Sequence, residues 1–161
     1  MAERLAGRRV DVEVATTIAR PCAVVAAYAA DPDNAPEWYA NIRSAVWRTP
    51  KPLAVGSEID FRARFMGRDL AYTYRVEEFV PGERLVMATA QGPFPMRTTY
   101  TWAVDQSGGD SHHSGSTVMT LRNDGAPRGF AALTAPLMEA MMRRANVKDL
   151  ARIKDILEAR G

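Results

Sequence analysis

The sequence predicts an α+β fold in which a curved antiparallel sheet is combined with one long C-terminal helix. Two observations lead to this prediction. Apolar and polar residues alternate with a period of two through most of residues 42–123, which is typical of half-buried strands. Residues 128–159 instead follow a helical period. A chain of 161 residues fits one domain, 1–161, with a core over about 10–159.

The predicted elements are one strand, two short helices, six further strands and the long helix. Pro21 suits the first turn of the first short helix, because an N–H at that position has no helical partner in any case. Asp31 and Pro32 end that helix, and a second short helix with Glu37 and Trp38 follows. The predicted strands are Val10–Ala19, Ile42–Arg48, Ser57–Phe65, Asp69–Phe79, Arg84–Gln91, Pro95–Val104 and Ser116–Asn123.

The long helix is predicted over Arg128–Ala159 and carries two apolar stripes that are rotated relative to each other. Such a drift is typical of a helix that bends to follow a curved sheet. Pro136 lies near its start, where it either kinks the helix or marks its first turn. Met138, Met141 and Met142 cluster near the middle. Methionine suits both an irregular core and an adaptable ligand surface, so both roles are open.

The inward faces of the middle strands mix aromatic rings with hydroxyl groups. Tyr72 and Tyr74 share one strand face, and Thr98 and Tyr100 share another. A buried hydroxyl without a partner costs about 1–3 kcal/mol, so a purely structural core favours aliphatic residues. These faces therefore predict a space that is wetted or filled by a ligand. The alternative is that the phenols reach solvent at the mouth of a cavity.

Other polar residues near the predicted apolar faces are weaker candidates for a functional site. Asn146 falls on the second stripe of the long helix, where it lies at a rim, bonds locally or contacts a ligand. Asp31, Asp33 and Glu37 cluster around the short helices, as caps and turn residues or as a carboxylate at a pocket entrance. Cys22 has no paired histidine, so a structural role is expected for its thiol.

Composition excludes several classes of function. The net charge is only +2, which is too small to indicate nucleic-acid binding. The single cysteine and the lack of a secretory signal favour the cytoplasm. The longest apolar run, residues 22–30, is far shorter than the roughly 20 residues that span a bilayer. His112 and His113 stand side by side in a Gly- and Ser-rich loop without metal-ligand spacing, so we expect neither a metal nor a cofactor.

Four segments carry a family resemblance: residues 18–42 (IARPCAVVAAYAADPDNAPEWYANI), 55–87 (VGSEIDFRARFMGRDLAYTYRVEEFVPGERLVM), 115–124 (GSTVMTLRND) and 147–159 (VKDLARIKDILEA). In order and spacing, over about Val10–Ala159, they resemble the polyketide cyclase/dehydrase-like branch of the START and Bet v 1-like (SRPBCC) superfamily. The resemblance implies the helix-grip fold, in which a curved seven-stranded antiparallel sheet grips the C-terminal helix around an internal cavity. Its members bind lipids, sterols, polyketides or other apolar molecules, and some are cyclases or dehydratases.

Under this fold the inward-facing residues form an apolar site with a few orienting hydroxyls, which is usual for a small-molecule pocket. Simple core packing is the alternative for each aromatic residue taken alone. The predicted ligand-binding residues are Tyr28, Trp38, Phe61, Ala63, Phe65, Tyr72, Tyr74, Met87, Thr98, Tyr100, Trp102, Met119, Met138, Met141 and Met142.

Three hypotheses for function follow. The first is a non-catalytic binder of a hydrophobic small molecule, acting as a monomer or homodimer. The second is a cyclase or dehydratase in which Tyr72, Tyr74 or Tyr100 donates a proton or acts as a base, although no histidine or buried carboxylate is expected on the inner strand faces. The third is a regulatory domain with a packed interior, which contacts partners through Met1–Arg9 and the loop Ser107–Gly115.

Overall fold

The computed structural model describes residues 9–65, 67–92, 95–107, 115–126 and 135–161. Its seven strands confirm the predicted ones, each within two residues at either end. The predicted beginning of the long helix falls partly outside the described residues. The elements are β1 (Val10–Ile18), α1 (Cys22–Ala30), the 3-10 helix η2 (Pro32–Asn34), α2 (Ala35–Trp38), β2 (Ile42–Trp47), β3 (Glu58–Phe65), β4 (Arg68–Val80), β5 (Arg84–Gln91), β6 (Met96–Val104), β7 (Thr117–Gly125) and α4 (Ala135–Ala159).

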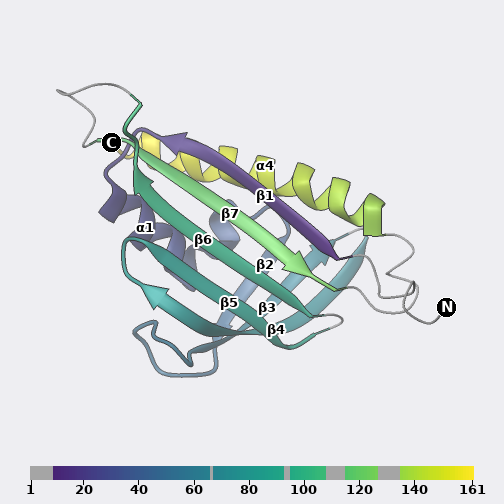
Figure 1. Cartoon of the computed structure of the whole chain (residues 1–161). Helices are drawn as coiled ribbons and strands as arrows, with labels where there is room; N and C mark the ends of the chain where they lie inside the picture. Colours follow the sequence, from purple (N-terminus) through teal and green to yellow (C-terminus); the bar gives the residue numbers. More distant parts are fainter. Residues whose placement is uncertain (1–8, 66, 93–94, 108–114, 127–134) are drawn as a thin grey trace.

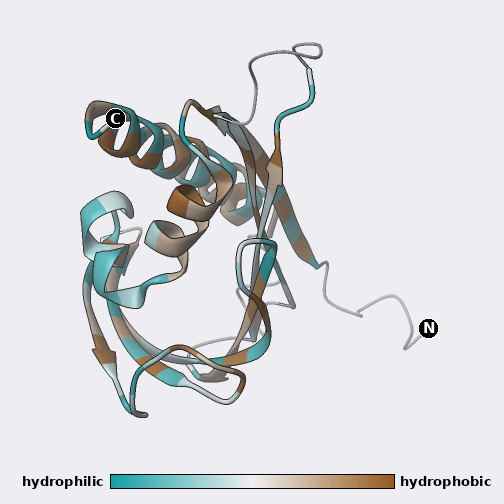
Figure 2. Cartoon of the chain, turned by 90° about the vertical axis from the view of Figure 1, so that its left-hand side faces the viewer, coloured by the Kyte–Doolittle hydropathy of each residue, from teal (hydrophilic) through white to brown (hydrophobic). Residues whose placement is uncertain are grey.

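The strands form one antiparallel sheet in the order β1-β7-β6-β5-β4-β3-β2. Strands β2 to β7 follow one another as a meander, and β1 pairs with the outer side of β7. The segment α1–η2–α2 connects the two edge strands. The sheet curls into a half-barrel, and α4 lies across its open side (Figures 1 and 2). The predicted α+β fold, a curved seven-stranded antiparallel sheet wrapped around the C-terminal helix, is confirmed.

Helix α4 is held mainly along one edge of this sheet. It packs on β1 and touches α2, and its contacts with β2 to β5 are sparse at most. Two cations on α4 reinforce the packing on β1, since Arg143 donates to the carbonyl of Glu13 at 3.1 Å and Lys154 donates to the carbonyl of Thr17 at 2.6 Å. Among the described residues, no helix therefore makes more than sparse backbone contacts with β3, β4 or β5.

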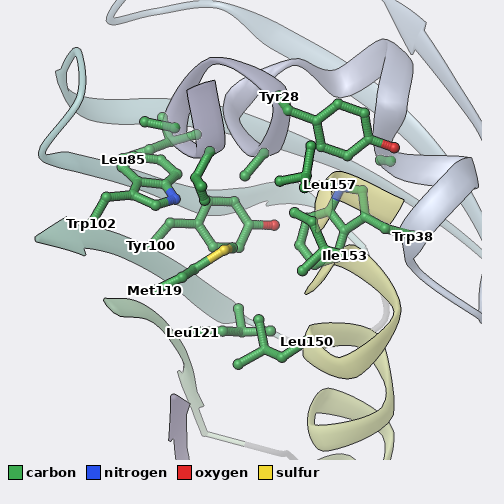
Figure 3. Packing of buried hydrophobic residues seen from close by; sticks show 14 of the residues in the cluster. Tyr28, Trp38, Leu85, Tyr100, Trp102, Met119, Leu121, Leu150, Ile153 and Leu157 are labelled. Atoms are coloured by element: carbon green, nitrogen blue, oxygen red, sulfur yellow. The ribbon is translucent and has the colours of Figure 1, made fainter. Parts of the chain in front are cut away.

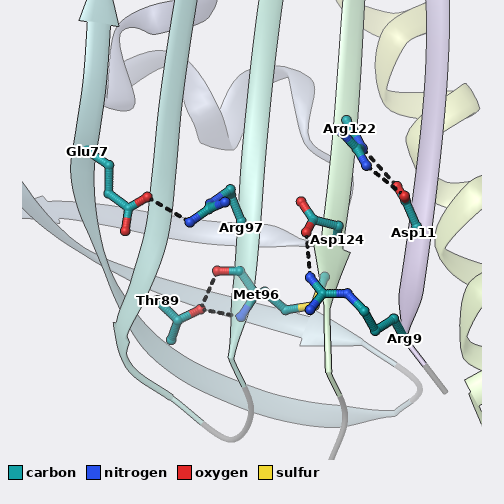
Figure 4. A network of polar contacts seen from close by, with 8 residues as sticks. All are labelled: Arg9, Asp11, Glu77, Thr89, Met96, Arg97, Arg122 and Asp124. Atoms are coloured by element: carbon teal, nitrogen blue, oxygen red, sulfur yellow. Dashed lines mark hydrogen bonds and ion pairs between the residues drawn. The ribbon is translucent and has the colours of Figure 1, made fainter. Parts of the chain in front are cut away.

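The outer face of the sheet is polar, because the residues that alternate with the inward set face solvent. Figure 4 shows two of its cross-strand pairs. Arg122 grips the carboxylate of Asp11 with two hydrogen bonds of 2.7 and 2.8 Å, and Arg97 lies 3.3 Å from Glu77. Exposed pairs of this kind contribute about 0–1 kcal/mol each. The stability of the fold therefore comes chiefly from its inner face.

Local sequence explains where the elements begin and end. Gly67 and Gly82 occupy the β3–β4 and β4–β5 turns with φ of 75° and 80°, a region that residues with a Cβ rarely adopt. Pro136 stands in the first described turn of α4, where proline is tolerated. None of the described helices is both long and apolar enough to cross a membrane.

Two apolar clusters hold α4 on the sheet. The main cluster joins Leu150, Ile153 and Leu157 to side chains of α1 and of β5 to β7 (Figure 3). The second cluster joins Ala135 and Met138, at the described beginning of α4, to the first residues of β1. The turns of α4 between these two clusters face the interior at a point where the sheet curves away.

Candidate ligand-binding cavity

A cavity of about 180 Å³ lies between the sheet and the middle turns of α4. One water molecule needs only roughly 10–15 Å³. Strands β3 to β6 supply much of the wall, and α4 and the segment from the end of α1 to the start of β2 supply the rest. The interior is thus not filled by side chains, contrary to what the hypothesis of a packed regulatory domain requires.

Ten of the fifteen predicted ligand-binding residues line this cavity. Most of them lie on strands, where the period-two alternation fixed their inward direction. Their role in binding a ligand remains a prediction. The ten residues are Trp38, Phe61, Ala63, Phe65, Tyr72, Tyr74, Met87, Thr98, Tyr100 and Met142.

Three of the other predicted residues belong to the main apolar cluster instead of the cavity wall (Figure 3). Trp102 and Met119 do point inward, but they lie at the end of the sheet that α1 covers, so other side chains fill the space in front of them. Tyr28 is buried beneath Arg160, and its hydroxyl donates to Oε2 of Glu37 at 2.5 Å. The prediction that these three line the cavity was wrong.

The methionines of α4 divide among three environments. Met142 lines the cavity, as predicted. Met138 packs on Val10 and Val12 in the second apolar cluster, and Met141 is half-buried but outside the cavity wall. The prediction that Met138 and Met141 line the cavity was wrong. Met138 lies on the same face of the helix as Met142 but one turn earlier, where this face meets β1 instead of the cavity.

The hydroxyl groups in the cavity are largely bonded to one another. The hydroxyls of Tyr39 and Tyr100 share a short hydrogen bond between the segment after α2 and β6. Thr98 donates to Oδ1 of Asn123 at 2.6 Å, and its oxygen lies 3.1 Å from the Tyr74 hydroxyl. Tyr39 and Asn123 were not predicted. Tyr39 lies outside the strands, so alternation gave no signal for it. Asn123 lies four positions after the predicted Met119 on the same face of β7, so alternation along that strand was the available signal.

Burial raises the pKa of four cavity tyrosines, Tyr39, Tyr72, Tyr74 and Tyr100, above the usual value of 10. For Tyr39 and Tyr72 the nearby phenols and the carboxylate of Asp149 raise the pKa further. Each hydroxyl therefore keeps its proton at neutral pH and can donate a hydrogen bond. A phenolate acting as a base is disfavoured in this cavity.

The cavity also contains a carboxylate, that of Asp149 on α4, which is only 2% exposed. Oδ1 of Asp149 accepts a hydrogen bond of 2.9 Å from the backbone N–H of Ala40, in the connection from α2 to β2. Burial raises the pKa of Asp149 from 3.8 to about 6, although the bond from Ala40 and the charge of Arg152 act in the opposite direction. The carboxyl group of Asp149 therefore changes its charge near pH 6.

Asp149 was not among the predicted residues, because a charged residue on a helix is usually solvated. A spacing signal was nevertheless present. Met142, Asn146, Asp149 and Ile153 follow one another at intervals of four, three and four residues, which places them on one face of a helix. A carboxylate on the same face as buried apolar residues was the available clue.

Asn146 lies one turn before Asp149 and also lines the cavity. Its side chain is 4% exposed, and its Nδ2 has no hydrogen-bond partner within the described part of the chain. Of the roles considered for Asn146, the rim position is wrong, since the residue is buried.

A second, wider hollow of about 660 Å³ lies outside the cavity, between α1 and the segments around Trp47 and Phe79. The two hollows share the residues Ala30, Asp31 and Pro32.

Asp33, which was considered as an entrance carboxylate, accepts from Nε1 of Trp47 and pairs with Lys51. Asp31 accepts from the N–H of Asp33 at 2.9 Å, and Glu37 accepts from Tyr28. The structure thus gives these acids local partners, as capping and turn residues require.

Several sequence predictions fall on residues that the structure does not describe. They concern His112 and His113, most of the loop Ser107–Gly115, and the arm Met1–Arg9 except for its last residue.

Comparisons with solved structures place the fold. The Zhui aromatase/cyclase from Streptomyces sp. R1128 superposes with a TM-score of 0.75 at 17% identity over 95% of this chain and 96% of its own. A START superfamily protein from Mycobacterium smegmatis superposes with a TM-score of 0.67 at 13% identity over 93% of this chain and 95% of its own. Ginseng major latex-like protein 151 from Panax ginseng superposes with a TM-score of 0.67 at 14% identity over 96% of this chain and 98% of its own. These superpositions show that the chain shares the fold of these proteins.

No protein with a curated description matches the chain by sequence. Residues 9–158, nearly the whole chain, match the family model described as polyketide cyclase/dehydrase and lipid transport. The chain therefore belongs to the polyketide cyclase/dehydrase and lipid transport family.

Proposed function

We propose that this protein binds a hydrophobic small molecule, of lipid, polyketide or aromatic type, in the cavity between the sheet and α4. The observation that carries the proposal is an unfilled cavity whose wall is mostly aromatic and aliphatic, with a few buried polar groups among them. Burial of apolar ligand surface against such a wall stabilises the complex by about 25 cal/mol for each Å² that is removed from water. The polar groups then orient the ligand.

Native mass spectrometry of the gently purified protein tests this proposal, together with the uptake of the uncharged fluorescent probe N-phenyl-1-naphthylamine. We expect a bound mass or a saturable rise in fluorescence that Ala63→Trp abolishes, because Ala63 lines the cavity. Ala135→Trp is the matched control, since Ala135 is equally buried but lies in the second apolar cluster. The absence of any bound mass together with the absence of probe uptake would overturn the proposal.

The second candidate function is a cyclase or dehydratase activity on a polyketide-like substrate, and the carboxylate of Asp149 favours it. A base with a pKa of about 6 is well matched to removing a proton from the carbon next to a ketone. Tyr72 or Tyr100 would donate a hydrogen bond to the oxygen of the resulting enolate. That carbon would then attack a second carbonyl to form the ring bond, and the new alkoxide would take up a proton.

Asp149→Asn tests this activity, because asparagine keeps the shape and the oxygen that accepts from Ala40 while removing the base. With a soluble poly-β-ketone as substrate, we expect the cyclisation rate to fall at least 100-fold. Asp155→Asn, at an exposed position of the same helix, should leave the rate unchanged. Equal rates in all three proteins would exclude Asp149 as the base, and tight binding without turnover would leave binding as the function.

A further inference from the structure

Two buried donors of the cavity wall, Nε1 of Trp38 and Nδ2 of Asn146, have no hydrogen-bond partner among the described residues, and the amide of Asn146 is the more polar of the two. Nδ2 of Asn146 is buried, and none of the described residues accepts a hydrogen bond from it. The whole side chain is 4% exposed and forms part of the wall on α4. A buried donor that stays unpaired destabilises the folded protein, so nearly all such donors in native proteins have a partner.

Several polar groups of the cavity are already engaged elsewhere. The hydroxyls of Tyr39 and Tyr100 are bonded to each other. Oδ1 of Asn123 accepts from Thr98, and Oδ1 of Asp149 accepts from the backbone of Ala40. Because no described residue accepts from Nδ2 of Asn146, an acceptor on a molecule in the cavity would complete its hydrogen bonding.

The kind of acceptor follows from the surroundings. Aromatic and aliphatic side chains dominate the wall, so a charged ligand group would lose its hydration without gaining a cation, since no lysine or arginine lines the cavity among the described residues. A neutral oxygen acceptor avoids this penalty. The carbonyl oxygen of a ketone or aldehyde is such an acceptor, and the terminal torsion of asparagine is broad enough to let the amide turn toward it.

We propose that the cavity selects ligands with a neutral carbonyl group, whose oxygen accepts a hydrogen bond from Nδ2 of Asn146. This inference rests on the proposed function, because it assigns a chemical class to the ligand of the same cavity. Asn146 is a specificity residue in this view. A ligand of the same shape without the carbonyl leaves the donor unpaired and binds more weakly.

Two probes of nearly equal shape test the inference: acetylnaphthalene, and isopropenylnaphthalene substituted at the same ring carbon, in which a CH₂ group replaces the carbonyl oxygen. Their dissociation constants are measured by displacement of the uncharged fluorescent probe N-phenyl-1-naphthylamine from the intact protein. We expect the wild type to prefer the ketone by about 10- to 100-fold after correction for the difference in the two probes' transfer from water.

Asn146→Leu has nearly the same side-chain volume but no donor, so the corrected preference should fall to about one. The unliganded variant should also unfold at a higher temperature than the wild type, because an unpaired buried donor has been removed. Asn146→Ala provides a second test of the preference should the leucine variant fail to fold. Lys148→Leu, at an exposed position of α4, is the control and should keep the preference of the wild type.

The outcomes separate the two proposals. Equal affinity of the wild type for both probes overturns the carbonyl assignment and leaves the binding function standing. A preference that persists in Asn146→Leu or Asn146→Ala also overturns it. If the wild type binds neither probe and takes up no N-phenyl-1-naphthylamine, the proposed function fails and the carbonyl assignment fails with it.

Discussion

The buried carboxylate of Asp149 and the backbone N–H of Ala40 are joined by a hydrogen bond of 2.9 Å, which fixes the α2–β2 connection to the middle of α4 at the wall of the cavity. Helix α2, which precedes this connection, is also tied to α4, because Nε of Arg152 donates to the carbonyl of Glu37 at 2.5 Å. The wall of the cavity on this side is thus held by side chains of α4.

The raised pKa of Asp149 predicts a pH dependence of stability. The folded protein binds the proton of this carboxyl more tightly than the unfolded chain does, since its pKa is about 6 in the folded protein and 3.8 for a freely solvated aspartate. The free energy of unfolding contributed by this group therefore falls as the pH rises from about 4 to about 6, by up to roughly 3 kcal/mol.

Urea denaturation of the wild type and Asp149→Asn across this range measures the effect as a difference between the two proteins. We expect the variant to become the more stable protein relative to the wild type as the pH rises. Asp155→Asn, on the exposed side of α4, should follow the wild type. A wild-type minus Asp149→Asn difference that does not change with pH would contradict the assigned pKa.

A second prediction concerns the ionisation of tyrosine. All five tyrosines of the chain have a raised pKa, chiefly through burial, and that of Tyr28 reaches about 12. The native protein should show little tyrosinate absorbance at pH 10, where free tyrosine is half ionised. Because ionisation favours the unfolded chain, stability should fall as the pH rises above 10. The same titration in urea supplies the reference, and a native midpoint at the urea value would refute the burial of these phenols.

The third prediction concerns the bond between the hydroxyls of Tyr39 and Tyr100. Either Tyr39→Phe or Tyr100→Phe alone leaves the remaining hydroxyl buried without this partner, so each should lower the free energy of unfolding by about 1–3 kcal/mol. The double variant should be less destabilised than the sum of the single ones by about 1 kcal/mol. Urea denaturation of the four proteins gives the coupling, and strict additivity would show that the two hydroxyls do not interact.

The fourth prediction uses the empty volume next to Ala63, which is 7% exposed and lines the cavity. Ala63→Trp should change the free energy of unfolding by less than about 1 kcal/mol, because the new ring enters existing space. Ala135→Trp should destabilise by about 1–3 kcal/mol or more, because its surroundings are filled. Thermal unfolding compares the two, and an equal loss in both variants would mean that the space beside Ala63 is not free.

The strand contribution to the cavity was predictable because alternation assigns a face to each residue without knowledge of its neighbours. Phe61, Tyr72 and Tyr100 accordingly line the cavity as expected. Alternation does not say what stands opposite a given residue. Trp102 and Met119 point inward, as Tyr100 does, but α1 covers their end of the sheet. That difference depends on where a helix from elsewhere in the chain is placed.

The helix contribution was harder to predict, since a helix presents side chains in every direction. The methionine cluster suggested a single wall, whereas only Met142 belongs to the cavity. From the sequence alone, Asp149 is expected to lie at the surface. In the structure it is buried next to the α2–β2 connection, and the backbone N–H of Ala40 donates a hydrogen bond to it. Ala40 and Asp149 are 109 positions apart in the sequence, so no local sequence pattern predicts their contact.

Helix α4 is held on the sheet at two places, by its contacts with β1 at Met138 and by the main apolar cluster around Ile153. The turns between these two places carry Met142, Asn146 and Asp149, which line the cavity. The proposed ligand contacts thus lie between the two groups of apolar contacts that hold α4 on the sheet, and Asp149 is followed directly by Leu150 of the main cluster. A substitution that changes which ligand the cavity accepts is therefore expected to change the stability of the fold as well.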